Sequence, residues 1–208
     1  MAGHVLRAMA HQAVDLGHPN QALDLAAASV DQQRYTAAAP RERALLGVVH
    51  ARALAVTGHG AEAATALLRA ENDLAAAKPG DDEPARVFFF GEASLAHETA
   101  CALRDLGDLG GATAQFQRSV KTRQAAAFTR THAVTLGYLG DVQARDGNFE
   151  QACDTWSQSL DAMDGIRSGR TRQVARNMRA VLAPLRPRGI RRVAEVDERA
   201  AAYLAHTR

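Results

Sequence analysis

The side chains of this sequence that are best suited to binding chemistry are arginines that stand shortly before a glycine. Arg7, Arg52, Arg104 and Arg145 each fall in a run with apolar residues at helical spacing, and each run ends on a glycine. A guanidinium carries a planar set of N–H donors that matches a carboxylate or a phosphate. These residues therefore predict recognition of an anionic group.

Motifs for catalysis are missing from the sequence. The eight histidines include no His-Glu-x-x-His pair, and neither Cys-x-x-Cys, Gly-x-Ser-x-Gly nor a phosphate-binding glycine loop occurs. Asp81, Asp82 and Glu83 could attract a cation, but an acidic run in a loop is more often solvated. We therefore predict no enzyme activity, no cofactor and no metal site.

The elements that would position the arginines repeat along the chain. Four times a helix-like run closes on a glycine and restarts at an alanine five residues later. A glycine there ends one helix, and a small alanine early in the next lets two antiparallel helices approach closely. The four steps are Gly17 to Ala22, Gly58 to Ala63, Gly107 to Ala112 and Gly147 to Ala152.

These steps predict an all-α fold, a right-handed solenoid of about four to five antiparallel helix pairs. The repeats cover about residues 4–32, 41–76, 85–124 and 128–163, and degenerate helices at 170–204 follow, the last of which caps the array. Helix pairs of this size use nearly all of the 208 residues, so we expect residues 1–208 to form a single domain. The strongest break, Lys78 to Pro84, is predicted to be a surface loop.

Composition supports alanine-rich helices around a thin core, because 47% of the residues are hydrophobic but only 5% are aromatic. No secretory signal is visible and no apolar stretch reaches about 18 residues, so we expect a cytoplasmic protein without membrane contact. Cys101 and Cys153 fall in predicted helices and are expected to be buried, reduced thiols.

The C-terminal part carries most of the positive charge. Residues 165–208 hold eleven arginines against three acidic residues, whereas residues 1–164 hold 14 basic and 20 acidic residues. Nucleic-acid binding is one interpretation, but Tyr203 is the sole aromatic residue there. We favour the interpretation that these arginines line a groove or pair with acidic residues of residues 1–164. Direct DNA binding is less favoured. The arginines in question are Arg167, Arg170, Arg172, Arg176, Arg179, Arg186, Arg188, Arg191 and Arg192.

The repeats resemble tetratricopeptide (TPR) repeats, over about residues 4–164. The fourth repeat matches that family's pattern most fully, at Leu139, Gly140, Gly147, Phe149, Ala152, Trp156 and Ser159. The third matches at Gly107, Ala112, Phe116 and Ser119, but Ala100 stands where a first-helix glycine would be, and the first two repeats keep only the skeleton. The resemblance implies a scaffold that binds a peptide or protein, with Phe116 and Trp156 in its core.

Two segments of the sequence resemble a more specific group of TPR proteins. HVLRAMAHQAVDLGHPNQALDLA near the start and RRVAEVDERAAAYL near the end are similar to the C-terminal TPR sensor region of actinobacterial helix-turn-helix transcriptional regulators. The chain begins at or inside the first repeat helix, so the DNA-binding head of such regulators is expected to be absent. The resemblance implies a ligand-sensing region of a transcriptional regulator, and a stand-alone TPR adaptor protein is the alternative.

In TPR arrays the first helix of each pair lines the concave face, which identifies a candidate groove here. A row of arginines on neighbouring repeats could clamp a peptide C-terminus or acidic side chains, while the alternative is that they are solvated or paired with Asp15 or Asp105. The groove positions are Arg7, His11, Arg52, His97, Cys101, Arg104, Asp141 and Arg145.

Two apolar features could contact another chain or simply complete the fold. Phe88, Phe89 and Phe90 cannot all face one side of a helix, because successive residues are rotated by about 100°. Burial between the flanking helices is favoured for them over a partner contact. The stripe of Val193, Val196, Ala200 and Tyr203 is expected to cap the solenoid, and a homodimer through this stripe is the alternative.

Overall fold

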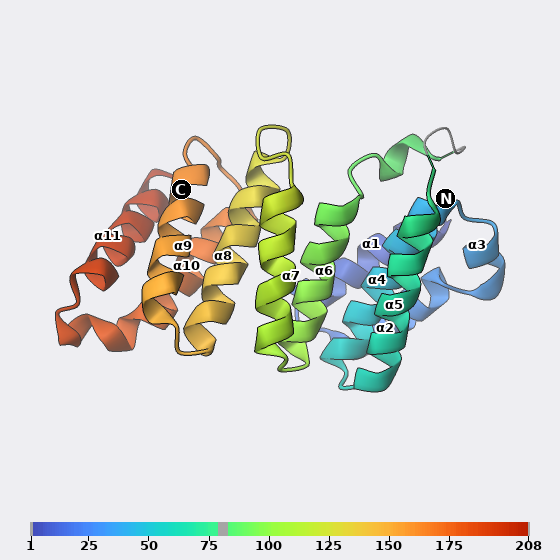
Figure 1. Ribbon diagram of the computed structural model, residues 1–208, viewed down its shortest axis with the longest axis horizontal. Helices are drawn as coiled ribbons and strands as arrows, with labels where there is room; N and C mark the ends of the chain where they lie inside the picture. Colours follow the sequence, from blue (N-terminus) through green and yellow to red (C-terminus); the bar gives the residue numbers. More distant parts are fainter. Residues whose placement is uncertain (1, 79–82, 208) are drawn as a thin grey trace. The chain divides into compact units, whose positions relative to one another are not determined.

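The computed structural model describes residues 2–78 and 83–207, and these form helices and connecting turns without a strand (Figure 1). The all-α solenoid expected from the sequence is confirmed. Two compact units divide the chain inside one helix, between Gln115 and Phe116. The helices are α1 (Ala2–Asp15), α2 (Pro19–Ser29), α3 (Gln32–Thr36), α4 (Pro40–Val56), α5 (Gly60–Ala76), η1 (Ala85–Val87), α6 (Glu92–Asp105), α7 (Leu109–Thr122), α8 (Thr129–Arg145), α9 (Phe149–Ala162), α10 (Gly169–Leu182), η2 (Ala183–Arg188) and α11 (Arg191–His206).

Four helix hairpins turn in the same way, each on a glycine in the left-handed region. Gly17, Gly58, Gly107 and Gly147 have φ values between 76° and 86°. The residue after each glycine donates its N–H, over 2.9 Å, to a carbonyl near the end of the preceding helix. These pairs are His18 to Ala13, His59 to Leu54, Asp108 to Leu103 and Asn148 to Gln143. The glycines thus end the helices by the motif that satisfies their last carbonyls.

The alanine of each step is fully buried in the first turns of the second helix of its hairpin. Ala22, Ala63, Ala112 and Ala152 are all 0% exposed. Each also donates its N–H to the carbonyl of the residue that follows the turn glycine, over 2.9 to 3.0 Å. A larger side chain at this position would have to push the two helices of the pair apart.

Replacing Gly58 with alanine is expected to lower the free energy of unfolding by about 1–2 kcal/mol, since its φ of 81° places a Cβ against the backbone. Gly60→Ala is the matched control, because Gly60 begins α5 and its Cβ would meet only Leu106 at an ordinary 3.6 Å. Urea denaturation followed by circular dichroism measures both. Equal losses in the two variants would contradict the assigned role of Gly58.

In the first unit, α4 is packed between other helices and buries side chains on all its sides. It contacts α1, α2, α5 and α6, and its buried Leu45, Val48 and Val49 belong to a core shared with the alanines of α1, α2 and α5. Because α4 has little exposed surface, the charged residues that it carries must find partners inside the unit. That requirement shapes the candidate site.

Two stretches of the first unit differ from the sequence-based expectation. The short helix α3 was not predicted, and it begins where the Asp31 carboxylate accepts the N–H groups of Gln33 and Arg34. The first helix of the third repeat was expected to begin at about residue 85, but this was wrong. A turn of 3₁₀ helix ends at Val87, and α6 begins only at Glu92 after an extended Gly91.

That break explains the three consecutive phenylalanines. Phe90 is 1% exposed, Phe89 packs partly against the core, and Phe88 is 79% exposed. Because the segment is not helical, it inserts Phe90 and Val87 into the core of the unit and leaves Phe88 in solvent. Burial of the triplet is thus only partial.

The second unit is held by α8, α9, α10 and α11 around Trp156, which is 0% exposed. Its indole N–H donates to the carbonyl of Gly137 at 3.2 Å. The first of the degenerate helices expected over 170–204 is α10, which ends at Leu182 and continues as the 3₁₀ turn η2. On α11, Val193, Val196 and Ala200 are buried within the unit, so the stripe is used inside the chain.

Candidate functional site

Three helices of the first unit bring six of the eight predicted groove residues into one charged cluster. Helix α1 supplies Arg7 and His11, α4 supplies Arg52, and α6 supplies His97, Cys101 and Arg104. Acidic residues from α1 and α6 lie among them. We define the charged cluster as Arg7, His11, Asp15, Arg52, His97, Glu98, Cys101, Arg104 and Asp105.

An ion pair between Arg52 and Glu98 lies at the centre of the charged cluster. The guanidinium donates to the Glu98 carboxylate over 2.8 Å, and their side chains are only 5% and 17% exposed. The His11 Nε2 lies 3.3 Å from the other carboxylate oxygen. Burial opposes ionisation of Glu98, but Arg52 and then His11 hold the pKa of its carboxyl well below its usual range. Glu98 is therefore charged at neutral pH.

Arg104 is neutralised by its neighbour in sequence. Its guanidinium contacts the Asp105 carboxylate at 2.7 Å, and both side chains are less than one-fifth exposed. Next to them Cys101 is fully buried, 3.9 Å from the ring of His97. Burial raises the pKa of the Cys101 thiol to about 11, so the group stays a protonated, weakly polar part of the cluster.

Two guanidinium groups of the charged cluster have donors without acceptors. The Nε atoms of Arg7 and Arg52 are buried and have no hydrogen-bond partner among the described residues. Asp15 lies 3.7 Å from a terminal nitrogen of Arg52, which is too long for a hydrogen bond. Burial lowers the pKa of Arg7, and the attraction of Glu98 offsets this only in part. The cluster thus holds cationic groups that could each accept a further anionic partner.

The remaining two predicted groove residues lie on α8 in the second unit. Asp141 is 8% exposed, whereas Arg145 is exposed in the last turn of its helix. Glu98 is the residue that the sequence reasoning missed. A signal was present, because Glu98 stands three residues before Cys101 and so shares its face of α6.

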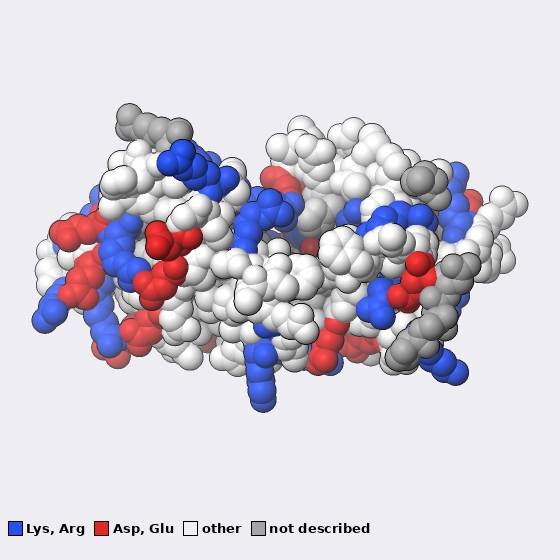
Figure 2. Space-filling model, turned by 90° about the horizontal axis from the view of Figure 1, so that it is seen from above, with Lys and Arg blue, Asp and Glu red and all other residues white. Residues whose placement is uncertain are grey.

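Arginines of the C-terminal part pair with acidic residues of the second unit. Arg192 contacts Asp154 and Arg199 contacts Asp161, both between α11 and α9. Asp197 accepts from both Arg179 and Arg186, at 2.9 and 2.8 Å. Figure 2 shows the result at the α11 end on the left, where basic and acidic side chains alternate. On the face that Figure 2 shows, the positive charge at this end is interspersed with negative charge.

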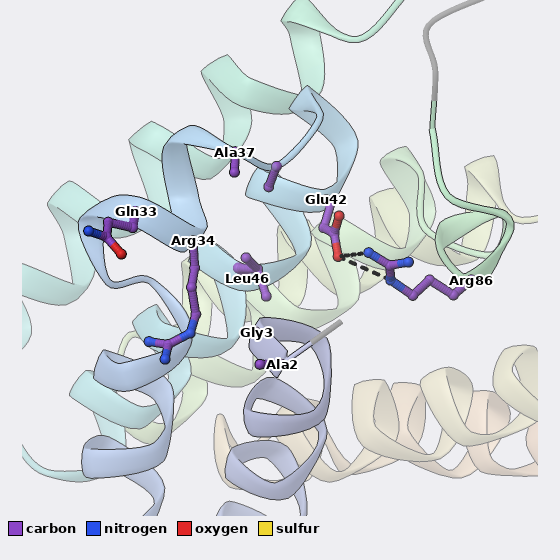
Figure 3. A pocket seen from close by; sticks show the side chains of 9 residues that line it. Ala2, Gly3, Gln33, Arg34, Ala37, Glu42, Leu46 and Arg86 are labelled. Carbon is purple, nitrogen blue, oxygen red and sulfur yellow. Dashed lines mark hydrogen bonds and ion pairs between the residues drawn. The ribbon is translucent and has the colours of Figure 1, made fainter.

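A pocket of about 330 Å³ lies beside the first turn of α1 (Figure 3). Its two arginines are already engaged. Arg86 from η1 donates to the Glu42 carboxylate on α4 over 2.7 Å, and Arg34 donates to the Ala28 carbonyl over 2.8 Å. Because both arginines already have acceptors, the N-terminus of α1 is the main group of this pocket that could still attract an anion.

The described residues hold neither an arrangement of metal ligands nor a helix that could span a membrane. No group of three or more His, Cys, Asp or Glu in residues 2–78 and 83–207 is arranged to hold a metal ion. The acidic run for which a solvated loop was favoured over a cation site falls partly outside them at Asp81 and Asp82, while Glu83 pairs with Arg41 at 2.6 Å. None of the described helices has the length and apolar character needed to cross a bilayer.

Comparison with known proteins finds no matching family model and no significant match among curated proteins. Solved structures do match. Nearly identical TPR-like repeats of a Podosopora anserina protein described as a kinesin light chain share 18% identity, with a TM-score of 0.64, over 99% of this chain and 96% of theirs. A single-substitution variant of that protein matches with the same TM-score. BtubC (BKLC) from P. vanneervenii matches with a TM-score of 0.59 and 15% identity, over 100% of this chain and 76% of its own. These likenesses define the fold as TPR-like.

Proposed function

We propose that this chain is a non-enzymatic scaffold that binds a peptide or protein, and that the ligand offers an acidic side chain or a C-terminal carboxylate to the charged cluster. The observation that carries the proposal is the pair of buried Nε donors of Arg7 and Arg52. Buried donors of a cation are costly to leave without an acceptor, so a carboxylate that reaches them recovers that cost.

Asp15 is the group that such a ligand would displace. Its side chain is 34% exposed, twice the value of Glu98, and it stands 3.7 Å from Arg52. An incoming carboxylate can bind the edge of the Arg52 guanidinium that faces Asp15, while Glu98 remains paired with the other edge. The ion pair of Arg52 and Glu98 then positions the arginine, and Arg7 supplies a second donor group.

The sensing region of a transcriptional regulator is the role that we propose for this scaffold, in the cytoplasm and with residues 1–208 acting as one domain. Its support is the similarity of the two terminal phrases to actinobacterial sensor regions. In this role, binding would shift the balance between conformations of the array. The alternative role, a stand-alone adaptor that joins two proteins, fits the same fold. A helix-turn-helix encoded upstream in the native reading frame would favour the regulator.

The binding proposal is tested with a library of peptides that end in acidic residues, each made with a free and with an amidated C-terminus. We expect the best free-carboxylate peptides to bind the whole chain and to lose at least about tenfold in affinity for Arg7→Gln, because a charge-assisted hydrogen bond supplies about 1.5–3 kcal/mol. Arg176→Gln, on α10 in the second unit, is the matched control and should bind normally. Binding that is equal in Arg7→Gln and wild type would remove the charged cluster as the site.

A second experiment tests the two other groove arginines, Arg104 on α6 of the first unit and Arg145 on α8 of the second unit. Arg104→Ala and Arg145→Ala are made separately and together, and their folding is checked by circular dichroism. We expect each single variant to bind acidic peptides more weakly than wild type. Unchanged affinity in the folded double variant would restrict the site to Arg7 and Arg52.

A further inference from the structure

A second site in the first unit shares no residue with the charged cluster. A pocket of about 610 Å³ opens between α4 and α5, next to the end of α2. Small-molecule sites span roughly 300–1,000 Å³. Helix α2 ends at Ser29, and its C-cap residue Val30 borders the pocket.

The floor of the pocket is apolar and is formed mostly by residues with short side chains. Gly47 and Leu54 of α4 and Ala66 of α5 line it, and Val30 borders it. Gly47 adds no side chain to the floor, and a Cβ there would meet the buried Ala70 at an ordinary 3.5 Å. Such a surface suits a saturated or aromatic body of a few carbon atoms.

Arg69 is an exposed residue that lines the pocket, and its guanidinium stacks on an aromatic ring and has no acidic partner among the described residues. Its guanidinium carbon lies 3.8 Å from the centre of the Tyr35 ring. Tyr35 is itself fixed, because its hydroxyl donates to Asp73, and the same carboxylate accepts from Arg43 at 3.0 Å. Among the described residues Arg69 makes no ion pair, whereas Arg43 has Asp73. A cation beside an apolar floor is complementary to an anionic head group.

Two other polar groups set the orientation of a ligand. His50 is half-buried and has no hydrogen-bond partner in the described part of the chain, and burial lowers its pKa, so it offers a neutral donor or acceptor. Glu62 lies at the opposite end of the pocket, two helical turns or about 10 Å before Arg69. Its negative charge repels an acid from that end and directs the head group to Arg69.

We propose that this pocket binds a carboxylate with an apolar body, the carboxylate on Arg69 and the body against Gly47, Leu54 and Ala66. The binding of a peptide at the charged cluster is not required for this inference. Two sources could supply the same chemistry, a free organic acid and the C-terminal residue of a peptide.

Calorimetric titration of the whole chain tests the site, with octanoate as the acid, octanol as its uncharged match, and an acetylated tripeptide ending in leucine as the peptide source. We expect Arg69→Gln to weaken octanoate by about five- to tenfold and to leave octanol unchanged. Glu62→Gln, in the same pocket, should leave octanoate unchanged or tighten it. The tighter of octanoate and tripeptide identifies the source.

Two tryptophan variants on exposed positions of α5 locate the ligand. Thr65 lines the pocket and Ala64 does not, so Thr65→Trp should abolish octanoate binding while Ala64→Trp preserves it. Absence of binding at millimolar octanoate and tripeptide would overturn the proposal. So would an Arg69→Gln variant that loses octanoate and octanol to the same extent, because the guanidinium would then have no role in choosing an acid.

Discussion

Replacing Trp156 with alanine is expected to lower the free energy of unfolding by about 3–5 kcal/mol, the range for truncating a large buried aromatic side chain. Trp156 is fully buried in the core of the second unit, with Met163, Val174 and Met178 among its members. The substitution also leaves the Gly137 carbonyl without the indole N–H that it accepts at 3.2 Å. Trp156→Phe keeps most of the volume and should cost less.

A second substitution shows whether the loss comes from this contact. Gly140 lies under the indole, and a Cβ there would come within 2.4 Å of the Trp156 Nε1. Gly140→Ala alone is therefore expected to cost about 1–3 kcal/mol by overpacking. In the Trp156→Ala background the space is free and most of that cost should vanish, which makes the two effects non-additive.

Far-ultraviolet circular dichroism in urea is the measurement for this cycle. Trp156 is the only tryptophan of the chain, so its own fluorescence cannot report on the variant that lacks it. Because the chain has two compact units, the transition must first be tested for two-state behaviour. A midpoint that barely moves in Trp156→Ala would mean that the register of the fourth repeat is wrong.

The repeats could be predicted because the information that defines them is local. Gly147 and Ala152 are five residues apart, and the conformation that each adopts depends on the hairpin in which it stands. The start of α6 could not be predicted in this way. Residues 85–90 contain no proline or glycine that would predict a break in a helix. Burial of Phe90 in the core stabilises a non-helical segment, and this burial depends on core residues that are far away in the sequence.

The arginines of the candidate site could be predicted, but their acidic partners could not, for a related reason. The arginines could be placed on a face of their helices from spacing alone, but their neutralisation depends on which acid another helix brings. Arg52 pairs with Glu98, which stands 46 residues later in the sequence. The local pattern around Arg52 does not indicate which residue of a distant helix will contact it. The pocket beside Tyr35 was missed because its residues come from three helices and the turn after α2, and none of them is unusual alone.

Glu98→Gln is expected to lower the free energy of unfolding by about 3 kcal/mol at pH 7, the lower end of the range for removing one partner of a buried ion pair. The lower end applies because Asp15 remains 3.7 Å from Arg52 and can take over part of its charge. Arg52 itself is 5% exposed and cannot turn to solvent without disturbing α4. Glu62→Gln is the matched control, since Glu62 is exposed and makes no ion pair among the described residues.

The pH dependence of stability should change in the same variant. Arg52 and His11, against burial, hold the pKa of Glu98 below its unfolded value of about 4.3. Such a carboxylate stabilises the fold above the unfolded pKa, and the contribution is lost as the pH falls from there through the folded pKa. The difference between wild type and Glu98→Gln is therefore expected to be constant near neutral pH and to shrink below about pH 4.3. Urea midpoints measured from pH 7 to acid conditions test this, and a difference that stays constant across the acid range would show that Glu98 does not titrate as a buried partner of Arg52.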